Sequence, residues 1–331
     1  RTVLIYRRFK VIRKSVFTSK KMALKALSSL SSDEYENFLN SFDTVLTDCD
    51  GVLWVEDELL QGSPEVINEF KRMGKKVFFV TNNSTKTRSE FLDKFRSLGF
   101  NAKKEEIIST AYLTAEYLSS MNFNKKVYVV GSSGMAKELD NVGIRHIGVG
   151  PDVMTSNLTE LVDNLKLDPE VGAVAVGLDV HFSVPKMIKA ASYLERKGTI
   201  FLTANTDERY PLDADAVMPA TGAFVAAIQT CAERKPIIVG KPGAYIRNYL
   251  VNKHKIDPSR TIMIGDRCNS DILLGKRCGF ETLLVLSGVT SLKQVKVWKD
   301  SKDKDKNELV PDYYTNKLGD LLPYVKNTWH Y

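Results

Sequence analysis

Two aspartates, Asp48 and Asp50, stand at the end of an apolar run in the stretch TVLTDCDGVLW, residues 44–54. Carboxylates this close repel each other, so the arrangement is costly unless a cation, a proton or a reacting phosphate uses it. Thr44–Thr47 predicts a strand, and open α/β sheets bind ligands at the carboxyl ends of their strands. The glycine turn that follows directs backbone N–H groups inward, which suits an anion. An ordinary Asp-Gly turn is the alternative interpretation.

A second polar group follows another apolar run, in the stretch FFVTNNST, residues 78–85. The hydroxyl of Thr81 has the chemistry to donate a hydrogen bond to a phosphoryl oxygen, and the amide of Asn82 has the chemistry to orient the leaving-group side. A turn that caps the next helix is the alternative.

A third group lies in the stretch IIVGKPG, residues 237–243, where Lys241 follows a strand and a glycine. A lysine there would neutralise phosphate charge as a point cation, although most lysines are simply exposed. The stretch lacks the GxxxxGK[ST] pattern, so it is not a Walker A loop.

The fourth group lies in the stretch TIMIGDRCNSDILLG, residues 261–275, where Asp266 ends a strand and Asp271 begins a helix. A carboxylate at the position of Asp266 suits a hard metal ion. Asp271 is expected either to support the metal ligands from behind or to be an acid that stabilises the start of its helix.

Short apolar runs alternate with amphipathic stretches along the chain, which predicts an α/β fold with a parallel sheet between helices. The predicted strands are Thr44–Thr47, Lys76–Thr81, Lys126–Val130, Gly172–Gly177, Thr199–Thr203, Pro236–Val239, Thr261–Ile264 and Thr282–Leu286. The predicted helices are Pro64–Met73, Thr87–Leu98, Thr110–Ser120, Pro185–Lys197, Gly222–Glu233, Ala244–Asn252 and Ser270–Cys278. The sequence VWKDSKDKDKNELV, residues 297–310, predicts a charge-dense surface loop.

The four polar groups lie before residue 100 or after residue 235, which leaves the middle of the chain as a separate α/β unit. We therefore expect four parts along the chain. They are a basic N-terminal extension over 1–31, which is disordered, a targeting sequence or not native and lies outside the core, the first part of a core domain over 32–122, an inserted α/β domain over 123–234, and the second part of the core over 235–331.

The net charge of +7 is local. Residues 1–21 hold eight Lys and Arg and no acid, so the remainder has 39 basic against 40 acidic residues, or −1. A neutral globular part argues against nucleic-acid binding. The basic segment is either a targeting sequence, which would make the protein mitochondrial, or sequence ahead of a start at Met22, the interpretation that we favour.

The remaining bulk features describe an ordinary globular protein. No apolar run approaches the ~20 residues that a membrane span needs, so we expect no membrane partner. The four cysteines are widely spaced and form no CxxC motif. This spacing argues against a disulfide framework and a zinc site, and it favours the cytoplasm.

Taken in order, the patterns D-x-D, T-N, G-K-P and G-D-x-x-x-x-D resemble the four motifs of the haloacid dehalogenase superfamily of Mg²⁺-dependent phosphatases. The resemblance runs from Ser32 to Trp329. It implies a Rossmann-like three-layer core with a parallel sheet, and an inserted α/β cap of the large type called C2. The stretches GLDVHFSVPKM, residues 177–187, and ANTDERYPL, residues 204–212, resemble the branch that contains phosphoglycolate, pyridoxal phosphate and p-nitrophenylphosphatase-like enzymes.

The resemblance also implies roles for the polar residues at the strand ends. Asp48 would be the nucleophile that forms an aspartyl-phosphate, and Asp50 the general acid that protonates the leaving alkoxide and then activates water. Mg²⁺ would be held by Asp48, the main-chain carbonyl of Asp50 and Asp266, with Asp271 behind them. The residues that would bind the phosphoryl group are Thr81, Asn82 and Lys241.

The cap is expected to select the substrate, a small phosphorylated metabolite. Arg209 is the first candidate, because its planar donors match a carboxylate and also reach a hydroxyl. Asn205 and Asp207 are weaker candidates. A surface arginine paired with Asp207 or Asp213 is the alternative interpretation of Arg209.

The pattern Asn-x-Asp-x-Arg-x-Pro-Leu, residues 205–212, is most similar to phosphatases of 2-phosphoglycolate or glycerol 3-phosphate, which are the expected substrates. A pyridoxal phosphate phosphatase and a broad p-nitrophenylphosphatase are alternatives. A protein phosphatase, a phosphomutase and a non-enzymatic binding protein on the same fold are alternatives from other classes. A large cap disfavours folded protein substrates, and the presence of all four motifs disfavours a binding protein. The resemblance further points to a homodimer through the cap.

Overall fold

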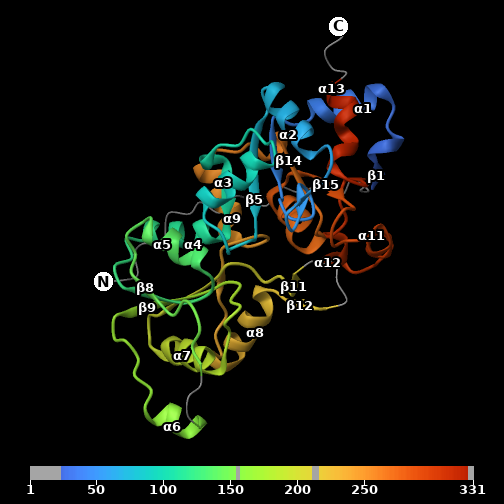
Figure 1. Cartoon of the computed structure of the whole chain (residues 1–331). Coiled ribbons are helices and arrows are strands. Elements are labelled where there is room, and N and C mark those ends of the chain that lie inside the picture. Colours follow the sequence, from blue (N-terminus) through green and yellow to red (C-terminus); the bar gives the residue numbers. More distant parts are fainter. Residues whose placement is uncertain (1–23, 154–156, 211–215, 327–331) are drawn as a thin grey trace.

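The computed structural model describes residues 24–153, 157–210 and 216–326 of the 331-residue chain, and two parallel sheets organise it (Figure 1). Within these ranges the larger sheet has seven strands in the order β1-β16-β15-β14-β2-β5-β6, and every neighbouring pair is parallel. Its strands are β1 Lys25–Ala26, β2 Thr44–Thr47, β5 Lys76–Thr81, β6 Ile107–Ser109, β14 Thr261–Gly265, β15 Glu281–Val285 and β16 Tyr313–Thr315.

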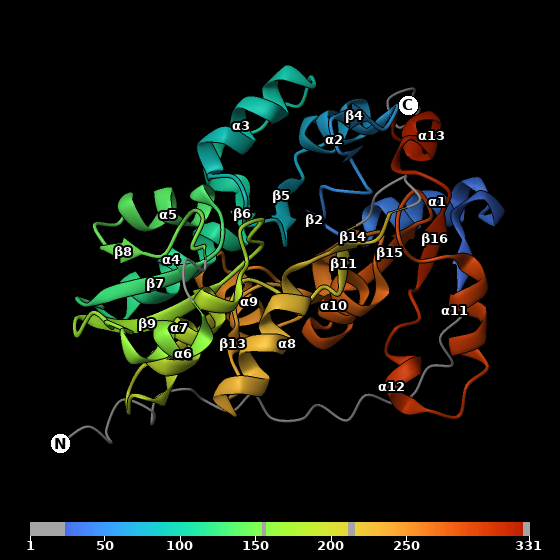
Figure 2. The ribbon, with the colours of Figure 1, turned by 60° about the horizontal axis from the view of Figure 1, so that its bottom comes forward.

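Helices cover both faces of the larger sheet (Figures 1 and 2). The helices on one face are α1 Ser32–Asn40, α2 Ser63–Arg72, α3 Arg88–Ser97 and α13 Leu322–Lys326. Those on the other are α4 Thr110–Ser120, α9 Ala244–Asn248 and α10 Leu273–Cys278. All four residues of the central strand β2 are buried, as expected for a parallel strand that is covered on both sides. The expected α/β fold with a three-layer core is confirmed.

The smaller sheet has, in the described part of the chain, five parallel strands in the order β13-β10-β9-β7-β8. These strands are β7 Lys126–Val130, β8 His146–Ile147, β9 Val171–Val176, β10 Ile200–Thr203 and β13 Ile237–Ile238. Helices α7 Val184–Glu195 and α8 Thr221–Ala232 pack on one face. The other face shares a hydrophobic cluster with α4 and with strands β2 and β5 of the larger sheet. A continuous apolar core therefore joins the two sheets.

Short elements complete the fold. The remaining helices are α5 Ser133–Asp140, α6 Leu158–Asp163, α11 Leu292–Lys299 and α12 Lys304–Asn307. The short helical turns are η2 Leu27–Ser29, η3 Lys104–Glu106, η4 Tyr249–Lys253, η5 Pro258–Arg260, η6 Cys268–Ile272 and η7 Leu318–Leu321. Two hairpins pair β3 Trp54–Val55 with β4 Glu58–Leu59, and β11 Arg209–Tyr210 with β12 Met218–Pro219. Among the described residues, none of the helices combines the length and the apolar character that crossing a membrane requires.

Most predicted elements agree with the observed ones. The strands β2, β5 and β7 and the helix α4 have the predicted bounds, and the other predicted strands differ by one residue at either end or by less. The helices predicted over 244–252 and 270–278 each overlap a wider helical turn, η4 and η6, which extends beyond the predicted range. Apart from β13, the strands of two or three residues, such as β6 and β8, were not predicted, because so few residues carry no periodic pattern.

Two expectations need correction. The expectation that residues 1–31 lie outside the core is wrong for 24–31, because β1 pairs in parallel with β16 and Leu27 is buried. Residues 1–23, and with them the choice between a targeting segment and a start at Met22, lie outside the described residues. The stretch 297–310 is not a plain loop, since it contains the end of α11 and all of α12, which the side chain of Asp303 caps.

Candidate active site

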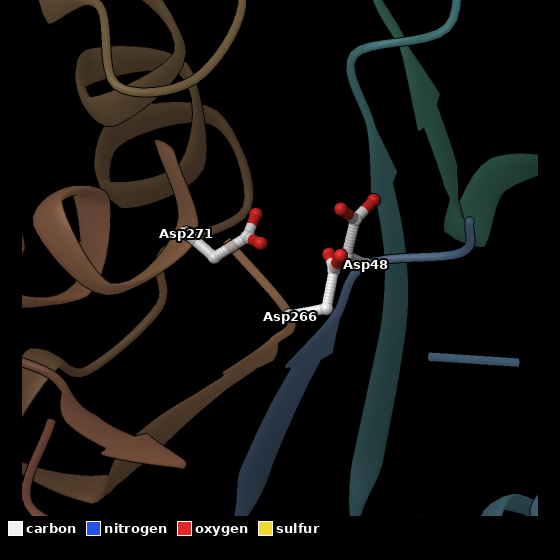
Figure 3. Close-up of side chains that lie close together, drawn as sticks. All are labelled: Asp48, Asp266 and Asp271. Atoms are coloured by element: carbon white, nitrogen blue, oxygen red, sulfur yellow. The ribbon is translucent and has the colours of Figure 1, made fainter. Parts of the chain in front are cut away.

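The candidate site forms where the strands β2, β14 and β5 end side by side. β2 lies between the other two, with Thr47 opposite Ile264 on one side and Phe79 on the other. The backbone N–H of Asp48 donates to the carbonyl of Ile264 at 2.9 Å, which extends the pairing by one residue. Asp48 and Asp266 consequently lie next to each other just beyond their strands (Figure 3).

Lys241 brings a positive charge to these carboxylates from a different part of the chain. It follows β13 of the smaller sheet, and its side chain is fully buried. Its Nζ lies 2.8 Å from an oxygen of Asp48 and 2.8 Å from an oxygen of Asp271, and it donates to the carbonyl of Val80 at 2.7 Å. Burial lowers the pKa of Lys241, but the charges of Asp271 and Asp48 outweigh this effect and raise the pKa. The ammonium therefore stays protonated.

The carboxylates of Asp48, Asp266 and Asp271 crowd together, and the side chain of Asp271 points toward the other two in Figure 3. One oxygen of each lies within 4.8 Å of the others. Burial and then the charge of Asp271 raise the pKa of Asp48 and of Asp266, while Lys241 opposes the shift. Three carboxylates against one buried lysine leave an excess of negative charge, which a cation with oxygen ligands would offset. These residues therefore fit a metal site, and Asp271 is a member of the cluster itself.

Asp50 lies beside this cluster, and its Oδ1 accepts a hydrogen bond from the indole N–H of Trp54 at 3.0 Å. Burial raises the pKa of Asp50, whereas the hydrogen bond from Trp54 and the charge of Lys94 lower it. A half-buried carboxyl group with a raised pKa is suited to hold a proton for transfer to a leaving group.

Asn82 connects three parts of the site. Its Oδ1 accepts a hydrogen bond from the backbone N–H of Lys241 at 2.9 Å, and its Nδ2 donates to the carbonyl of Lys241 at 3.1 Å. The same Nδ2 lies 3.1 Å from Oδ2 of Asp207, and the side chain of Asn205 donates to the carbonyl of Asn82 at 2.7 Å. Both ends of the Asn82 amide are thus engaged within the protein.

One pocket collects most of the residues that the sequence predicted. Those that line it are Asp48, Asp50, Thr81, Asn82, Asn205, Asp207, Arg209 and Asp266. Lys241 and Asp271 lie behind its wall, where both are buried. The lining residues that were not predicted are Asn83, Ser84, Thr85, Leu178, Tyr210, Ala220, Thr221, Arg267, Ser270 and Val289. Asn83–Thr85 follow Thr81 and Asn82 in the sequence, which was a usable signal. Leu178 lies in the stretch 177–187 that resembles this phosphatase branch, but neither Leu178 nor Thr221 was proposed as a site residue.

Arg267 is the most informative residue that the sequence interpretation missed. It follows Asp266 directly, yet its guanidinium reaches the loop of the other sheet, where Nη2 donates to the carbonyl of Arg209 at 3.0 Å. Its Nη1 lies 3.9 Å from carboxylate oxygens of Asp207 and of Glu208. The side chain of Arg209 is exposed and makes no ion pair with Asp207, and Asp213 lies outside the described residues.

Comparison with known proteins identifies the family. A family model described as haloacid dehalogenase-like hydrolase matches residues 45–145, and a HAD hydrolase-like model matches residues 238–321. The chain is 39% identical over 305 residues to the glycerol-3-phosphate phosphatase of Homo sapiens. This match covers 90% of this chain and 95% of that protein. It is 37% identical over 310 residues to the chloroplastic phosphoglycolate phosphatase 1A of Arabidopsis thaliana, with 92% and 83% covered.

A solved structure supports the same assignment. The p-nitrophenyl phosphatase from Archaeoglobus fulgidus matches with a TM-score of 0.71 and 27% identity, over 86% of this chain and 99% of that one. The similarity in sequence and in fold thus extends over nearly the whole chain. The chain belongs to the haloacid dehalogenase superfamily and is one of its phosphatases.

Proposed function

We propose that this phosphatase hydrolyses a small phosphorylated metabolite through an aspartyl-phosphate on Asp48, with Mg²⁺ as its metal. The observation that carries the proposal is the position of Lys241, 2.8 Å from Asp48 and 2.8 Å from Asp271 behind a pocket that loops of both sheets line. A buried lysine beside the nucleophile supplies positive charge where phosphoryl oxygens would lie.

The proposed reaction has two steps. Asp48 attacks phosphorus, and the bond to the leaving oxygen breaks with its electrons on that oxygen, which takes a proton from Asp50. A water molecule then attacks the aspartyl-phosphate and loses a proton to Asp50, which releases phosphate and restores Asp48. Thr81 and Lys241 hold the phosphoryl oxygens throughout. Because both ends of the Asn82 amide are engaged, we assign Asn82 to holding Lys241 and the loop of Asn205 and Asp207 in place.

Asp48, Asp266 and Asp271 are the side chains that would hold Mg²⁺, together with the main-chain carbonyl of Asp50. When bound, the ion supplies positive charge that offsets the charges of the phosphate and of these carboxylates. The crowding of the three carboxylates within 4.8 Å supports this assignment. Carboxylate oxygens are also the ligands that Mg²⁺ prefers.

We propose that residues 32–122 and 235–331 form the catalytic core and residues 123–234 form a cap. β13 pairs with β10 of the smaller sheet, which supports an end of the cap at Ile238, four residues beyond this boundary. The cap loop that carries Asn205, Asp207 and Arg209 lines the same pocket as the core aspartates. This position supports selection of the substrate by the cap.

Glycerol 3-phosphate and 2-phosphoglycolate are the proposed substrates, since relatives with these names are 39% and 37% identical. The exposed guanidinium of Arg209 at the pocket is a donor for a carboxylate or a hydroxyl, and Asp207 is an acceptor for a hydroxyl. We also propose a homodimer through the cap. Exposed apolar side chains support it, at Val153 (73% exposed), Leu158 (52%), Val162 (51%) and Val180 (77%). A cytoplasmic location remains a prediction from the cysteine pattern.

Phosphate release from a small panel tests the proposal. The panel contains 2-phosphoglycolate, glycerol 3-phosphate, pyridoxal 5′-phosphate, p-nitrophenyl phosphate and a phosphotyrosine peptide, each with Mg²⁺ and with a chelator. We expect turnover that depends on Mg²⁺ and prefers the first two. Turnover of p-nitrophenyl phosphate alone would agree with the proposed mechanism but contradict the two proposed substrates. No turnover of any of the five would contradict the proposed function.

A further inference from the structure

Trp54 contacts the proposed general acid although it does not line the pocket. Its indole N–H donates to Oδ1 of Asp50 at 3.0 Å, and the residue is completely buried. An indole has one polar atom, and a buried indole N–H usually finds a partner. Here the partner is the carboxyl group to which the reaction assigns a proton transfer.

The chain holds the indole in place from several sides. Within the turn, the N–H of Gly51 donates to the carbonyl of Trp54 at 2.7 Å, which keeps the backbones of Asp50 and Trp54 together. The rings of Phe95 and Phe100 pack edge-on against the indole, with centroids 4.9 and 6.1 Å away.

Lys94 adds a contact from above the ring. Its Nζ lies 4.7 Å from the centre of the indole and 3.0 Å from an oxygen of Asp57, and it also donates to the carbonyl of Glu56. Glu56 and Asp57 form the turn between β3 and β4. The β3–β4 hairpin and α3 thus hold the indole in one orientation, in which its N–H points to Asp50.

A carboxyl group on a short side chain rotates easily unless a partner fixes it. The bond from Trp54 occupies Oδ1 of Asp50, while Asp50 lines the pocket together with Asp48. We propose that Trp54 is a positioning residue that holds the Asp50 carboxyl group in the orientation from which it protonates the leaving oxygen. The inference rests on the proposed function and adds a residue to its first step.

The leaving group provides a test that a purely structural role would not pass. When phosphorus passes to Asp48, an alkoxide leaving group needs the proton of Asp50, whereas p-nitrophenolate leaves as a stable anion. A general acid contributes about 10²- to 10⁴-fold to a step that needs its proton. A misaligned Asp50 should therefore slow the first step of alkyl phosphates far more than that of p-nitrophenyl phosphate, whereas the second step, in which Asp50 takes a proton from water, is the same for both.

The experiment compares Trp54→Phe with the unaltered full chain in Mg²⁺. The substrates are p-nitrophenyl phosphate and whichever of glycerol 3-phosphate and 2-phosphoglycolate is turned over faster. In single-turnover reactions, release of the leaving group reports the first step alone. We expect its rate to fall by about tenfold or more on the alkyl phosphate and by less than about threefold on p-nitrophenyl phosphate. An equal loss on both substrates, or no loss on either, would overturn the inference.

Two control variants separate positioning from packing. Trp298→Phe makes the same chemical change in α11, at a residue that does not line the pocket, and should leave both rates unchanged. Phe42→Leu trims a ring that packs on Phe38 and Phe70 in the same core, and it should lower stability without changing the ratio of the two rates. If Trp54→Phe does not fold, 3-benzothienylalanine at position 54 keeps the shape and removes the N–H. If the unaltered chain turned over neither substrate, the proposed function would be contradicted, and the inference with it.

Discussion

Two buried lysines show two kinds of charged interior in this molecule. Lys186, on α7 of the smaller-sheet unit, pairs with Asp179 at 2.6 Å, and both side chains are almost completely inaccessible. Lys241 lies 2.8 Å from Asp48 and 2.8 Å from Asp271, and Asp266 completes the cluster. The first arrangement is electrically balanced, while the second carries surplus negative charge.

The difference shows that burial of a charge does not by itself mark a functional site. Asp179 also accepts a hydrogen bond from the backbone N–H of His181 at 2.8 Å, so the balanced pair ties the loop after β9 to α7. Such a pair satisfies itself and needs no ligand. The surplus negative charge around Lys241 needs a cation to offset it, which is the property of a site that binds a metal ion.

The largest expected effect comes from removing the charge of Asp48 in the site, with removal of the charge of Asp179 in the balanced pair as the control. Asp48→Asn removes the nucleophile, and we expect kcat to fall by more than about 10³-fold while the chain still folds. Asp179→Asn should leave kcat within about threefold of the unaltered chain, since it touches no reacting group. Phosphate release with a soluble substrate measures both. Substantial turnover by Asp48→Asn would contradict the nucleophile assignment.

Replacing the two lysines should have different main effects, on stability for Lys186 and on kcat for Lys241. Lys186→Met leaves Asp179 buried without its partner, and we expect a loss of about 3–5 kcal/mol in the free energy of unfolding. The double variant Lys186→Met with Asp179→Asn should recover most of that loss. Lys241→Met should lower kcat by about 10²- to 10³-fold. Urea denaturation measures the free energy of unfolding, and phosphate release measures kcat. Equal kcat values for Lys186→Met and Lys241→Met would contradict the functional difference between the two buried lysines.

The surplus charge also predicts how pH and Mg²⁺ act together. Burial and Asp271 raise the pKa of Asp266 to about 7, above its ordinary value of 3.8, when no metal is bound. Between about pH 4 and 7 the folded chain then binds more protons than the unfolded chain, so its free energy of unfolding falls as pH rises. Mg²⁺ competes with these protons, so its stabilisation should be larger at pH 8 than at pH 6.

Calorimetry with Mg²⁺ and with a chelator measures this dependence. At an Mg²⁺ concentration 100 times its Kd, we expect a gain of about 2.7 kcal/mol at pH 8. Asp266→Asn should lose most of the gain, whereas Asp179→Asn should keep it. A gain that does not change between pH 6 and pH 8 would mean that Mg²⁺ displaces no proton from this cluster.

The smallest expected effect concerns the contact between the two regions. Arg267→Gln removes the hydrogen bond to the carbonyl of Arg209 and the positive charge near Asp207. The cap loop should then be held less firmly, and we expect KM to rise about fivefold with kcat changed by less than about twofold. Arg260→Gln, which breaks an exposed pair with Asp43, is the matched control and should change neither. A change confined to kcat would place Arg267 in the chemical step instead.

Much of the core was predictable because it depends on local pattern. Apolar runs such as Thr44–Thr47 and Lys76–Thr81 read as buried strands, and their observed bounds agree. The polar residues that follow them had to meet at one edge, since parallel strands end together. Short strands such as β1 and β6, the two residues of β11, and the helix α12 carried too little pattern to be recognised.

The sequence by itself determined which strands end in Asp48, Thr81 and Asp266, and which motif family these ends resemble. Only the tertiary structure decided that Asn82 joins Lys241 to Asp207, that Arg267 crosses to the loop of Arg209, and that the indole of Trp54 meets Asp50. The contact from Asn82 to Asp207 spans 125 positions and that to Lys241 spans 159. Periodicity reports which face of one element is buried, but packing of separate elements determines which side chains from distant positions come within hydrogen-bonding distance.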